Sequence, residues 1–476
     1  MQGDVGAQHK TYDVVIFGAG IVGCVTALLI RQCLPHLRVL LVDPSFSISD
    51  AAQQAVQGRY ANSYLWGEAW RVSAVSLSVR ALLETLGLWE QVLARGVCPY
   101  HDMVVADAEG TGRFHLSAQM AGESCLGYLL ENEVLLGCLR AACLADGELD
   151  CLDGYRLESV LPHEQNNAVK NGPTFDVVCV PAALRAKCDD ANQQSLGGDP
   201  IRLSARLLIG AEGRESRLRE QLGVPVSRRS YAQTALVCQV ETVHAHDWTA
   251  WQDFLETGPL AFLPLSARAG FDPAQEMDWP MAADSERYCS IVWSLPPETA
   301  AALSREDAAE DLLSRLNALA PAPLGGVRRC SVAGAFPLNG HMAAQMQQPG
   351  AVILGDAAHG YHPMAGQGLN VGLLDAAVLV DQLAHCDGRL GDFNHPAGLR
   401  RFERRRRFQQ RALYELTSGL HGLYGRSEWW LRVGRNVGMR MFDAVAPLKK
   451  FLVQRANAHR VDLPERFRPT ATLLPF

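Results

Sequence analysis

A glycine-rich turn between two apolar runs, close to the start of the chain, constrains the fold more than any other feature. The run Tyr12–Phe17 has the length and composition of a buried parallel strand, and it leads directly into the glycine-rich segment 18–23. A helical stretch over Val25–Gln32 follows, and a second apolar run, Arg38–Val42, ends at Asp43. Strand, glycine turn, helix and second strand in this order predict a complete βαβ unit of a Rossmann-like α/β fold.

The three glycines of this unit each have a physical role in binding a dinucleotide. Gly18 permits the tight turn, Gly20 lets the backbone approach a pyrophosphate, and Gly23 lets the helix pack closely on the strand. The free N–H groups at the helix N-terminus then face the phosphates. Asp43 stands twenty residues after Gly23, where a carboxylate can accept hydrogen bonds from a ribose hydroxyl. The spacing predicts a bound dinucleotide but does not separate FAD from NAD.

Two more strand-to-glycine junctions occur further along the chain. The first is the run Arg206–Gly213, which includes Glu212 and precedes a polar helix that opens at Arg214. The second is Ala351–His359, which includes Gly355 and Asp356. Because ligands bind at the carboxyl edge of an open α/β sheet, we expect the three junctions to converge there.

The segment after the third junction favours a flavin. Asp356 at a strand end suits a ribityl hydroxyl, and the glycine-rich stretch 366–372 precedes a helix expected over Leu373–Leu383. The positive end of that helix can stabilise negative charge on a reduced flavin ring. Short alternating apolar runs at Thr234–Val240 and Tyr288–Leu295 predict an antiparallel sheet that covers the flavin.

Composition excludes several other classes of protein. No apolar run is long enough to span a bilayer, and the first residues lack the pattern of a secretory signal. Thirteen cysteines are scattered without a Cys-x-x-Cys pair, which indicates free thiols in a reducing compartment and predicts no metal site. From Arg400 onward 17 Lys/Arg face 6 Asp/Glu, but no nucleic-acid-binding motif accompanies them.

The basic C-terminal part is expected to be helical. Leu399–Thr417 carries the arginines 404–407, and apolar residues recur at helical spacing from Trp430 to Val445 until Pro447 ends the pattern. Arg432, Arg435 and Arg440 fall on the other face of that second helix. Two interpretations stay open: a helix packed on the FAD domain with a solvated basic face, or an amphipathic surface that meets anionic lipid or partner subunits.

The three junctions together resemble the class A flavin monooxygenases, which have the para-hydroxybenzoate-hydroxylase fold. The most specific block is Gly-Asp-Ala-Ala-His at 355–359, followed by His-Pro-x-Ala-Gly-Gln-Gly-Leu-Asn-x-Gly at 362–372. The resemblance narrows to the ubiquinone-biosynthesis hydroxylases of the UbiH/UbiF/VisC type. It rests on segments spread from about residue 12 to about residue 458, among them 71–78, 127–132, 258–265, 290–294 and 433–438.

This resemblance implies a Rossmann-like FAD-binding domain interleaved with a mixed or antiparallel substrate domain, followed by C-terminal helices. The implied segments are 11–95, 126–219 and 331–385 for the FAD-binding domain, 96–125 and 220–330 for the substrate domain, and 386–476 for the helical end. The implied cofactor-binding residues are Gly18, Gly20, Gly23, Asp43, Arg71, Glu131, Glu212, Gly355, Asp356, Gly366, Gln367, Gly368 and Asn370. No second nucleotide unit is visible, so NAD(P)H is expected to act as a transient co-substrate with O2.

The implied function is hydroxylation of the aromatic ring of a polyprenylated phenol in ubiquinone biosynthesis. Two alternatives stay open: hydroxylation of a soluble aromatic compound, and a low-turnover flavin-binding subunit of a biosynthetic complex. The expected location is the cytoplasm. Peripheral contact with the inner face of the inner membrane, contact with other quinone-biosynthesis proteins and a homo-oligomer are left open.

Two departures from the family pattern stand out, and no catalytic acid or base can be assigned. Glu212 replaces the usual Asp of the middle block, which moves its charge and is expected to alter a hydrogen bond on the flavin or NADPH side. The loop 268–287 is longer than the family norm. His359 and His362 are expected to have structural roles.

Overall fold

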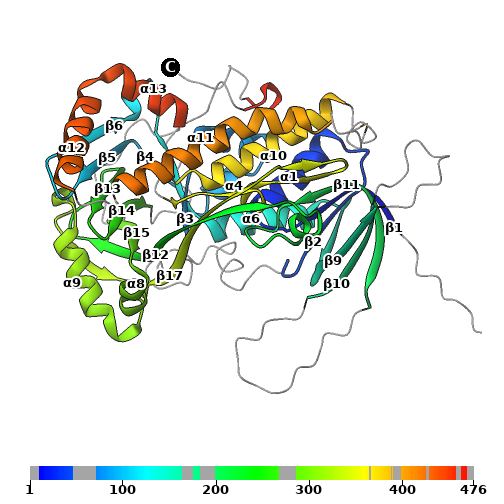
Figure 1. Ribbon diagram of the computed structural model, residues 1–476, viewed down its shortest axis with the longest axis horizontal. Coiled ribbons are helices and arrows are strands. Elements are labelled where there is room, and N and C mark those ends of the chain that lie inside the picture. The colour runs from blue at the N-terminus through cyan, green and yellow to red at the C-terminus, as the bar shows by residue number, and fades with distance from the viewer. Residues whose placement is uncertain are drawn as a thin grey trace, which may run out of the picture.

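The structure is a computed structural model, and it describes most of the chain. The described residues are 10–46, 71–162, 175–182, 199–266, 286–363, 366–386, 389, 398–424, 428–456 and 463–468. Nearly all of the long loop 268–287 lies outside them. Two large sheets lie side by side, and long helices cover the first of them (Figure 1).

The first sheet has eight strands and is mainly parallel at its centre. Its main path runs β18-β19-β11-β1-β2-β8, and β10 and β9 extend from β11 as antiparallel neighbours. The strands are β1 Lys10–Phe17, β2 Val39–Asp43, β8 Leu149–Asp153, β9 Tyr155–Pro162, β10 Phe175–Pro181, β11 Ile201–Gly210, β18 Gln347–Gln348 and β19 Ala351–Ile353. The order of β1, β2 and the intervening helix confirms the predicted βαβ unit.

Strand β1 is apolar along its whole inner length because both of its faces are buried. Alternate side chains of a strand point to opposite faces, so Val14 and Ile16 join one core cluster while Val15 and Phe17 join another. Several helices contribute to the first of these clusters, among them α1 Ile21–Cys33, α6 Asn132–Ala145 and α10 Gly368–His385. Both α1 and α10 extend beyond the stretches expected from the sequence.

The second sheet has nine strands and is mostly antiparallel. Its order is β20-β17-β12-β15-β14-β13-β5-β6, and β16 pairs with β12. The strands are β5 Asp102–Asp107, β6 Arg113–Ser117, β12 Val226–Thr242, β13 Thr249–Leu255, β14 Gly258–Leu265, β15 Tyr288–Leu295, β16 Val327–Cys330, β17 Gly334–Ala343 and β20 His359–Gly360. The alternating runs predicted as strands are therefore parts of β12 and β15. The domain boundaries stay a prediction. Strand β17 lies inside the segment 331–385 expected for the FAD-binding domain, but it pairs with β12 of this sheet.

Smaller elements connect the two sheets. A three-stranded sheet, β3-β7-β4, is formed by Val72–Val75, Gly127–Glu131 and Cys98–Tyr100. The shorter helices are α3 Leu77–Thr85, α4 Trp89–Leu93, α5 Ala118–Ala121, α7 Arg217–Gln221, α8 Pro297–Leu303 and α9 Ala309–Leu319. Among the described residues, no helix is both long and apolar enough to cross a membrane. The twelve described cysteines are all free thiols.

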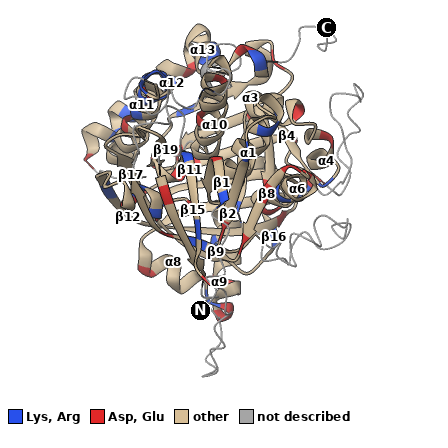
Figure 2. Ribbon diagram, turned by 90° about the vertical axis from the view of Figure 1, so that its right-hand side faces the viewer, with Lys and Arg blue, Asp and Glu red and all other residues tan. Residues whose placement is uncertain are grey.

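Three helices form the C-terminal part, and their basic residues are visible in Figure 2. They are α11 Arg400–Tyr424, α12 Trp429–Ala444 and α13 Ala446–Ala456. Pro447 does end the pattern of α12, but it lies in the first turn of α13, where a missing N–H costs nothing.

One of the two interpretations of α12 was a solvated basic face. The structure differs from it at one of the three arginines. Arg435 is 5 % exposed, whereas Val433, Val437 and Met441 are exposed. The physical reason is that α12 packs on β6, close to the carboxylates of Asp107 and Glu109, which pair with Arg435.

Candidate flavin-binding site

Three chain segments begin side by side at the carboxyl edge of the first sheet. Strands β1, β11 and β19 are parallel neighbours, with Phe17 opposite Gly210 and Gly210 opposite Ile353. The ladder continues one residue further, because the Ala211 N–H donates to the Phe17 carbonyl at 2.7 Å and the Leu354 N–H donates to the Gly210 carbonyl at 2.9 Å. The three strand-to-glycine junctions therefore converge at one edge, as the sequence predicts.

The first glycine turn has the geometry of a phosphate cradle. Gly18 has φ +99°, and a β-carbon on Gly23 would lie 1.8 Å from the Gly18 carbonyl oxygen, so neither position tolerates a side chain. Gly20 faces open space, with nothing within 4 Å of a β-carbon placed there. No side chain caps the N-terminus of α1, and no acidic residue stands in its first turn. Its N–H groups are therefore available to an anion.

Asp43 lies beside this turn at the end of β2. One carboxylate oxygen accepts from the Ala19 N–H at 2.6 Å and the other accepts from the Ser45 N–H at 2.8 Å. Arg140 of α6 donates through Nε to the Ala19 carbonyl at 3.0 Å and approaches Asp43 at 3.7 Å. Arg140 thus fixes both the turn and the acid, a contact that the sequence analysis missed. A signal was available, since Arg140 is the only charged residue of α6 after its first turn.

Glu212 is turned toward α7. Its Oε2 accepts from the Ser216 hydroxyl at 2.7 Å and from the Leu218 N–H at 2.9 Å, and Ser216 in turn caps α7. Burial raises the pKa of Glu212, although these hydrogen bonds oppose the rise. The carboxylate that replaces the family's Asp therefore holds the start of α7. Its assignment as a cofactor-binding residue stays a prediction.

The third junction is stabilised by a buried ion network that the sequence analysis did not foresee. Asp375 of α10 accepts from His359 Nε2 at 2.6 Å, from Arg406 Nε at 2.7 Å and from Gln410 Nε2 at 2.8 Å. Burial alone would raise the pKa of Asp375, but Arg406 and His359 outweigh it and lower that pKa. His359 thus has the structural role expected of it, immediately after the Gly355–Asp356 turn.

The start of α10 is connected to the segment that contains Arg71. Asn370 is 2 % exposed; its Oδ1 accepts from the Ser76 N–H and its Nδ2 donates to the Ala74 carbonyl, both at 2.9 Å. Asn370 also donates to Gln367 Oε1 at 3.1 Å. No side chain caps α10, and nothing lies within 4 Å of a β-carbon placed on Gly368. This helix N-terminus is therefore open to a ligand.

Gly366 stands two residues before the first residue of α10 and has φ +59°. Gly355 packs on α1, where a β-carbon would meet Val22 Cγ2 at 3.1 Å. Asp356 is exposed, and its carbonyl accepts from His341 Nε2 at 2.8 Å. The turn that carries Asp356 is therefore held by α1 on one side and by His341 of β17 on the other.

Arg71 and Glu131 lie next to each other at one end of the three-stranded sheet. Arg71 is exposed, and its carbonyl accepts from the Asn132 N–H at 2.9 Å. Glu131 is 5 % exposed and accepts from Gln239 Nε2 of β12 at 2.8 Å. The pair therefore lies where the three-stranded sheet meets the nine-stranded sheet.

A cluster of aromatic rings lies beside the third strand-to-glycine junction, on the side of α11. The ring centroids of Tyr231 and His362 lie 4.8 Å apart, and those of His362 and His421 lie 5.4 Å apart. His362 Nε2 also contacts Gln233 Oε1 at 3.2 Å. Burial, with His421 as the second cause, lowers the pKa of His362 to about 4. His362 is therefore neutral at physiological pH, in keeping with a structural role.

The residues at this edge fit FAD. The Gly18–Gly23 turn and the α1 N-terminus would hold the pyrophosphate, Asp43 the adenosine ribose, Asp356 the ribityl chain, and the α10 N-terminus the ring. When bound, the flavin supplies electron transfer from NAD(P)H and the transfer of one oxygen atom. The protein supplies positioning and the exclusion of water.

A separate polar cluster lies between β4 and two connecting segments of the second sheet, one between β12 and β13 and one just before β15. Cys98, His246 and Glu286 place ligand-type atoms within 4.8 Å of one another. His246 Nδ1 accepts from the Trp248 N–H at 3.1 Å, so Nε2 carries the proton and donates to the Leu265 carbonyl at 3.1 Å. Both ring nitrogens are thus engaged with the backbone, which is the arrangement of a hydrogen-bonded core histidine. The expected absence of a metal stays a prediction.

Comparison with known proteins identifies the chain's relatives. A family model described as an FAD binding domain matches residues 182–414. The ubiquinone hydroxylase UbiL of Rhodospirillum rubrum is 28% identical and covers 95% of this chain and 90% of its own. The 3-demethoxyubiquinol 3-hydroxylase of Escherichia coli is 28% identical, with 93% and 97% covered. The mitochondrial ubiquinone biosynthesis monooxygenase COQ6 of Homo sapiens is 27% identical, with 95% and 94% covered.

Solved structures show the same fold. The p-nitrophenol 4-monooxygenase PnpA of Pseudomonas putida superposes with a TM-score of 0.67 at 15% identity, covering 95% of this chain and 100% of its own. PqsL of Pseudomonas aeruginosa, a probable FAD-dependent monooxygenase, gives 0.63 at 22% identity, with 91% and 100% covered. The chain is an FAD-dependent aromatic-ring monooxygenase, and it is similar over more than nine-tenths of its length to these ubiquinone-biosynthesis hydroxylases.

Proposed function

We propose that this protein hydroxylates the aromatic ring of a polyprenylated phenol in ubiquinone biosynthesis, using FAD, NAD(P)H and O2. The observation that carries the proposal is the shared sheet edge, where an open phosphate cradle at α1 and an open helix N-terminus at α10 meet. Relatives named for ubiquinone hydroxylation align with more than nine-tenths of the chain. Together they support a flavin held at this edge and a phenolic ring presented from the side of the nine-stranded sheet.

The proposed cofactor-binding residues fall into two groups by what the structure shows of them. Gly18, Gly20, Gly23, Asp43, Gly355, Asp356 and the 366–370 segment surround the edge described above. Arg71, Glu131 and Glu212 form hydrogen bonds that join the segments next to this edge to one another. We propose that the first group contacts the flavin and that the second positions the first.

The proposed location is the cytoplasm, with peripheral contact at the inner face of the inner membrane. A polyprenyl tail of the proposed substrate resides in the bilayer, so the enzyme has to reach the membrane surface to meet the phenol. Contact with other quinone-biosynthesis proteins would serve the same purpose.

The test is mass spectrometry of quinone lipids from cells that lack this gene and have no redundant hydroxylase. We expect an under-hydroxylated polyprenyl phenol to accumulate, and its mass and fragmentation reveal the ring position. Restoring the wild-type gene should clear the intermediate, whereas restoring Gly20→Ala should clear it poorly and Gly147→Ala fully. Unchanged ubiquinone with no intermediate would contradict the proposal and favour a soluble aromatic substrate.

A further inference from the structure

The outer surface of α12 and α13 is apolar along both helices. Of the fifteen exposed large apolar residues in the described part of the chain, eight lie on these two helices and a ninth, Val445, joins them. The nine residues, here called the α12–α13 face, are Trp429, Trp430, Val433, Val437, Met441, Val445, Leu448, Phe451 and Leu452. Trp429 is 75% exposed and Met441 is 66% exposed. Single exposed apolar residues are ordinary, but a concentration of this kind marks an interaction surface.

The apolar side faces outward because the inner side of α12 is held by charge. Arg435 Nε lies 3.2 Å from Asp107 Oδ2, and Arg435 Nη2 lies 3.0 Å from Glu109 Oε2. Asn436 adds a hydrogen bond to Asp107 at 3.1 Å. Breaking a buried ion pair of this kind costs several kcal/mol, so α12 cannot rotate to bury its apolar side. The exposure is therefore a fixed property of the fold.

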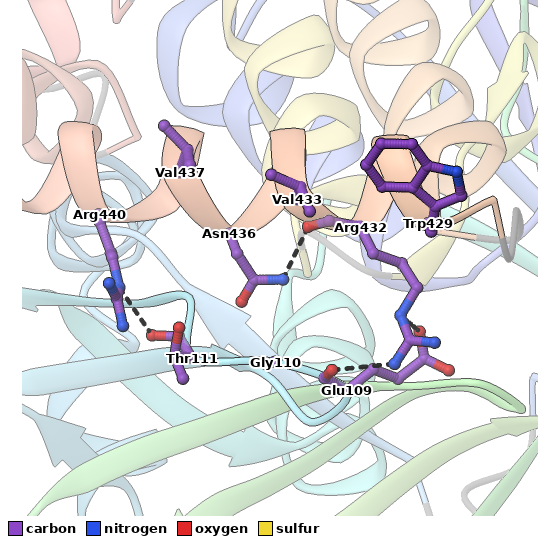
Figure 3. A pocket seen from close by; sticks show the side chains of 9 residues that line it. All are labelled: Glu109, Gly110, Thr111, Trp429, Arg432, Val433, Asn436, Val437 and Arg440. Atoms are coloured by element: carbon purple, nitrogen blue, oxygen red, sulfur yellow. Dashed lines mark hydrogen bonds and ion pairs between the residues drawn. The ribbon is translucent and has the colours of Figure 1, made fainter.

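Basic side chains flank the apolar surface. The two helices carry six Lys/Arg and one Asp over residues 429–456, and two of these cations, Arg435 and Lys449, are buried and paired with carboxylates. A groove of about 450 Å³ runs between α12 and the turn 109–111, with Arg432 and Arg440 along it. Figure 3 shows these two arginines reaching toward that turn, and Trp429, Val433 and Val437 line the same groove from α12. Lys450 is exposed on α13.

We propose that the α12–α13 face docks on the surface of an anionic phospholipid bilayer. The apolar side chains would enter the boundary between headgroups and acyl chains, and the two tryptophans suit that boundary because their rings are amphipathic. Arg440 and Lys450, both exposed, would meet lipid phosphates, whereas Arg432 is paired with Glu109 at 3.3 Å. A second copy of the chain fits less well, because a two-fold contact would bring these cations close to their own copies.

This inference rests on the proposed peripheral membrane contact and does not depend on which phenol is hydroxylated. It names the surface and the lipid chemistry by which the enzyme reaches the membrane. The two ideas can fail separately, because vesicle binding is measured without a phenol.

The experiment is flotation of the purified, FAD-loaded protein with vesicles of phosphatidylcholine alone and of phosphatidylcholine mixed equally with phosphatidylglycerol. We expect binding to the mixed vesicles only, weakening as salt screens the attraction. Lys450→Gln should weaken binding about fivefold. The double variant Trp430→Ser, Met441→Gln should weaken it about tenfold or more. The matched control is Leu161→Ser, which removes an exposed apolar side chain of β9, far from α12 and α13 in Figure 1.

Folding of each variant is checked by its FAD content and its thermal unfolding, so a loss of binding is not confused with a loss of structure. Equal binding to both kinds of vesicle, or unchanged binding by the double variant, would overturn the proposal. So would a wild-type dimer that the double variant dissociates while its vesicle binding stays intact, because the α12–α13 face would then be a subunit interface.

Discussion

Two glycines of the first turn, only three residues apart, meet different physical limits. Gly23 has no room for a side chain, because the Gly18 carbonyl already occupies the position of its β-carbon. Gly20 has room in the protein itself, with nothing within 4 Å. The space at Gly20 is therefore kept open for what binds there, whereas the space at Gly23 serves the fold.

Alanine at these two positions should separate folding from cofactor binding. Gly20→Ala should leave the apoprotein's thermal unfolding unchanged and weaken FAD binding about tenfold or more, equivalent to roughly 1.4 kcal/mol. Gly23→Ala should destabilise the apoprotein itself by about 1–3 kcal/mol, because the turn must shift away from α1. The measurements are flavin absorbance titration and calorimetry of the apoprotein.

Gly147→Ala is the control, since Gly147 also faces open space but lies far along the chain from the turn, just before β8. Unchanged FAD affinity in Gly20→Ala would show that no ligand approaches this turn closely.

The glycine turn could be predicted from the sequence, because the conformational demands on each glycine appear directly as spacing. The partners of Asp43 and Glu212 could not. Arg140 contacts the turn from 121 residues away, and the hydrogen bonds of Glu212 depend on where α7 begins relative to the carboxylate. Such contacts depend on packing, which local spacing does not encode.

At the scale of elements, a buried ion pair joins α10 and α11. Arg406 is 1 % exposed and lies against Asp375, while Phe402 of α11 packs in the same core as the apolar side of α10. The second long helix is therefore attached to the helix whose N-terminus faces the flavin site.

Removing one partner of this pair should be far more costly than removing a neighbouring surface arginine. Arg406→Met leaves the Asp375 carboxylate buried without its cationic partner, held by His359, Gln410 and the Gly355 N–H, and we expect a loss of about 3–5 kcal/mol in the free energy of unfolding. The control Arg405→Gln removes a half-exposed cation that lies 3.4 Å from Asp381, and it should cost less than about 1 kcal/mol. Urea unfolding measures both, and equal losses would contradict the buried-pair account.

Helix existence was predictable here, but helix orientation was not. The 3.6-residue pattern marks α11 and α12 clearly, yet the sequence analysis left two orientations of α12 open, one of them with its basic side facing water. Asp107, which holds Arg435 on the inner side, lies 328 residues earlier in the chain. An amphipathic pattern states that a helix has two sides and leaves open which side the fold covers.

Across the whole molecule, two buried histidines make stability depend on pH. Burial lowers the pKa of His246 to about 4 and that of His362 also to about 4. In the unfolded chain both titrate near the usual value of about 6.5. Between these values the unfolded chain binds more protons than the folded one, so stability falls as pH falls from about 6.5 toward 4.

We expect each of these histidines to cost about 2 kcal/mol of stability between pH 7 and pH 5. His246→Gln should therefore show a smaller drop in the urea midpoint over this range than the wild type. His36→Gln, which changes an exposed histidine, should show the wild-type drop. A wild-type slope retained in His246→Gln would mean that folding does not shift the pKa of this ring.

The general architecture was predictable because each strand-to-glycine junction is a local pattern that repeats. The register that places the junctions side by side is not local. It depends on β1 pairing with β11 and on β11 pairing with β19.

That register has a consequence for biosynthesis. Strand β1 ends at Phe17, but its partner β11 starts at Ile201 and the next strand, β19, at Ala351, so this sheet has high contact order. A nascent chain leaving the ribosome carries the apolar β1 for most of translation before β11 and β19 can cover it, which invites aggregation unless a chaperone intervenes. The cofactor cradle is complete only when α10 has emerged, so flavin incorporation belongs to the last stage of the protein's maturation.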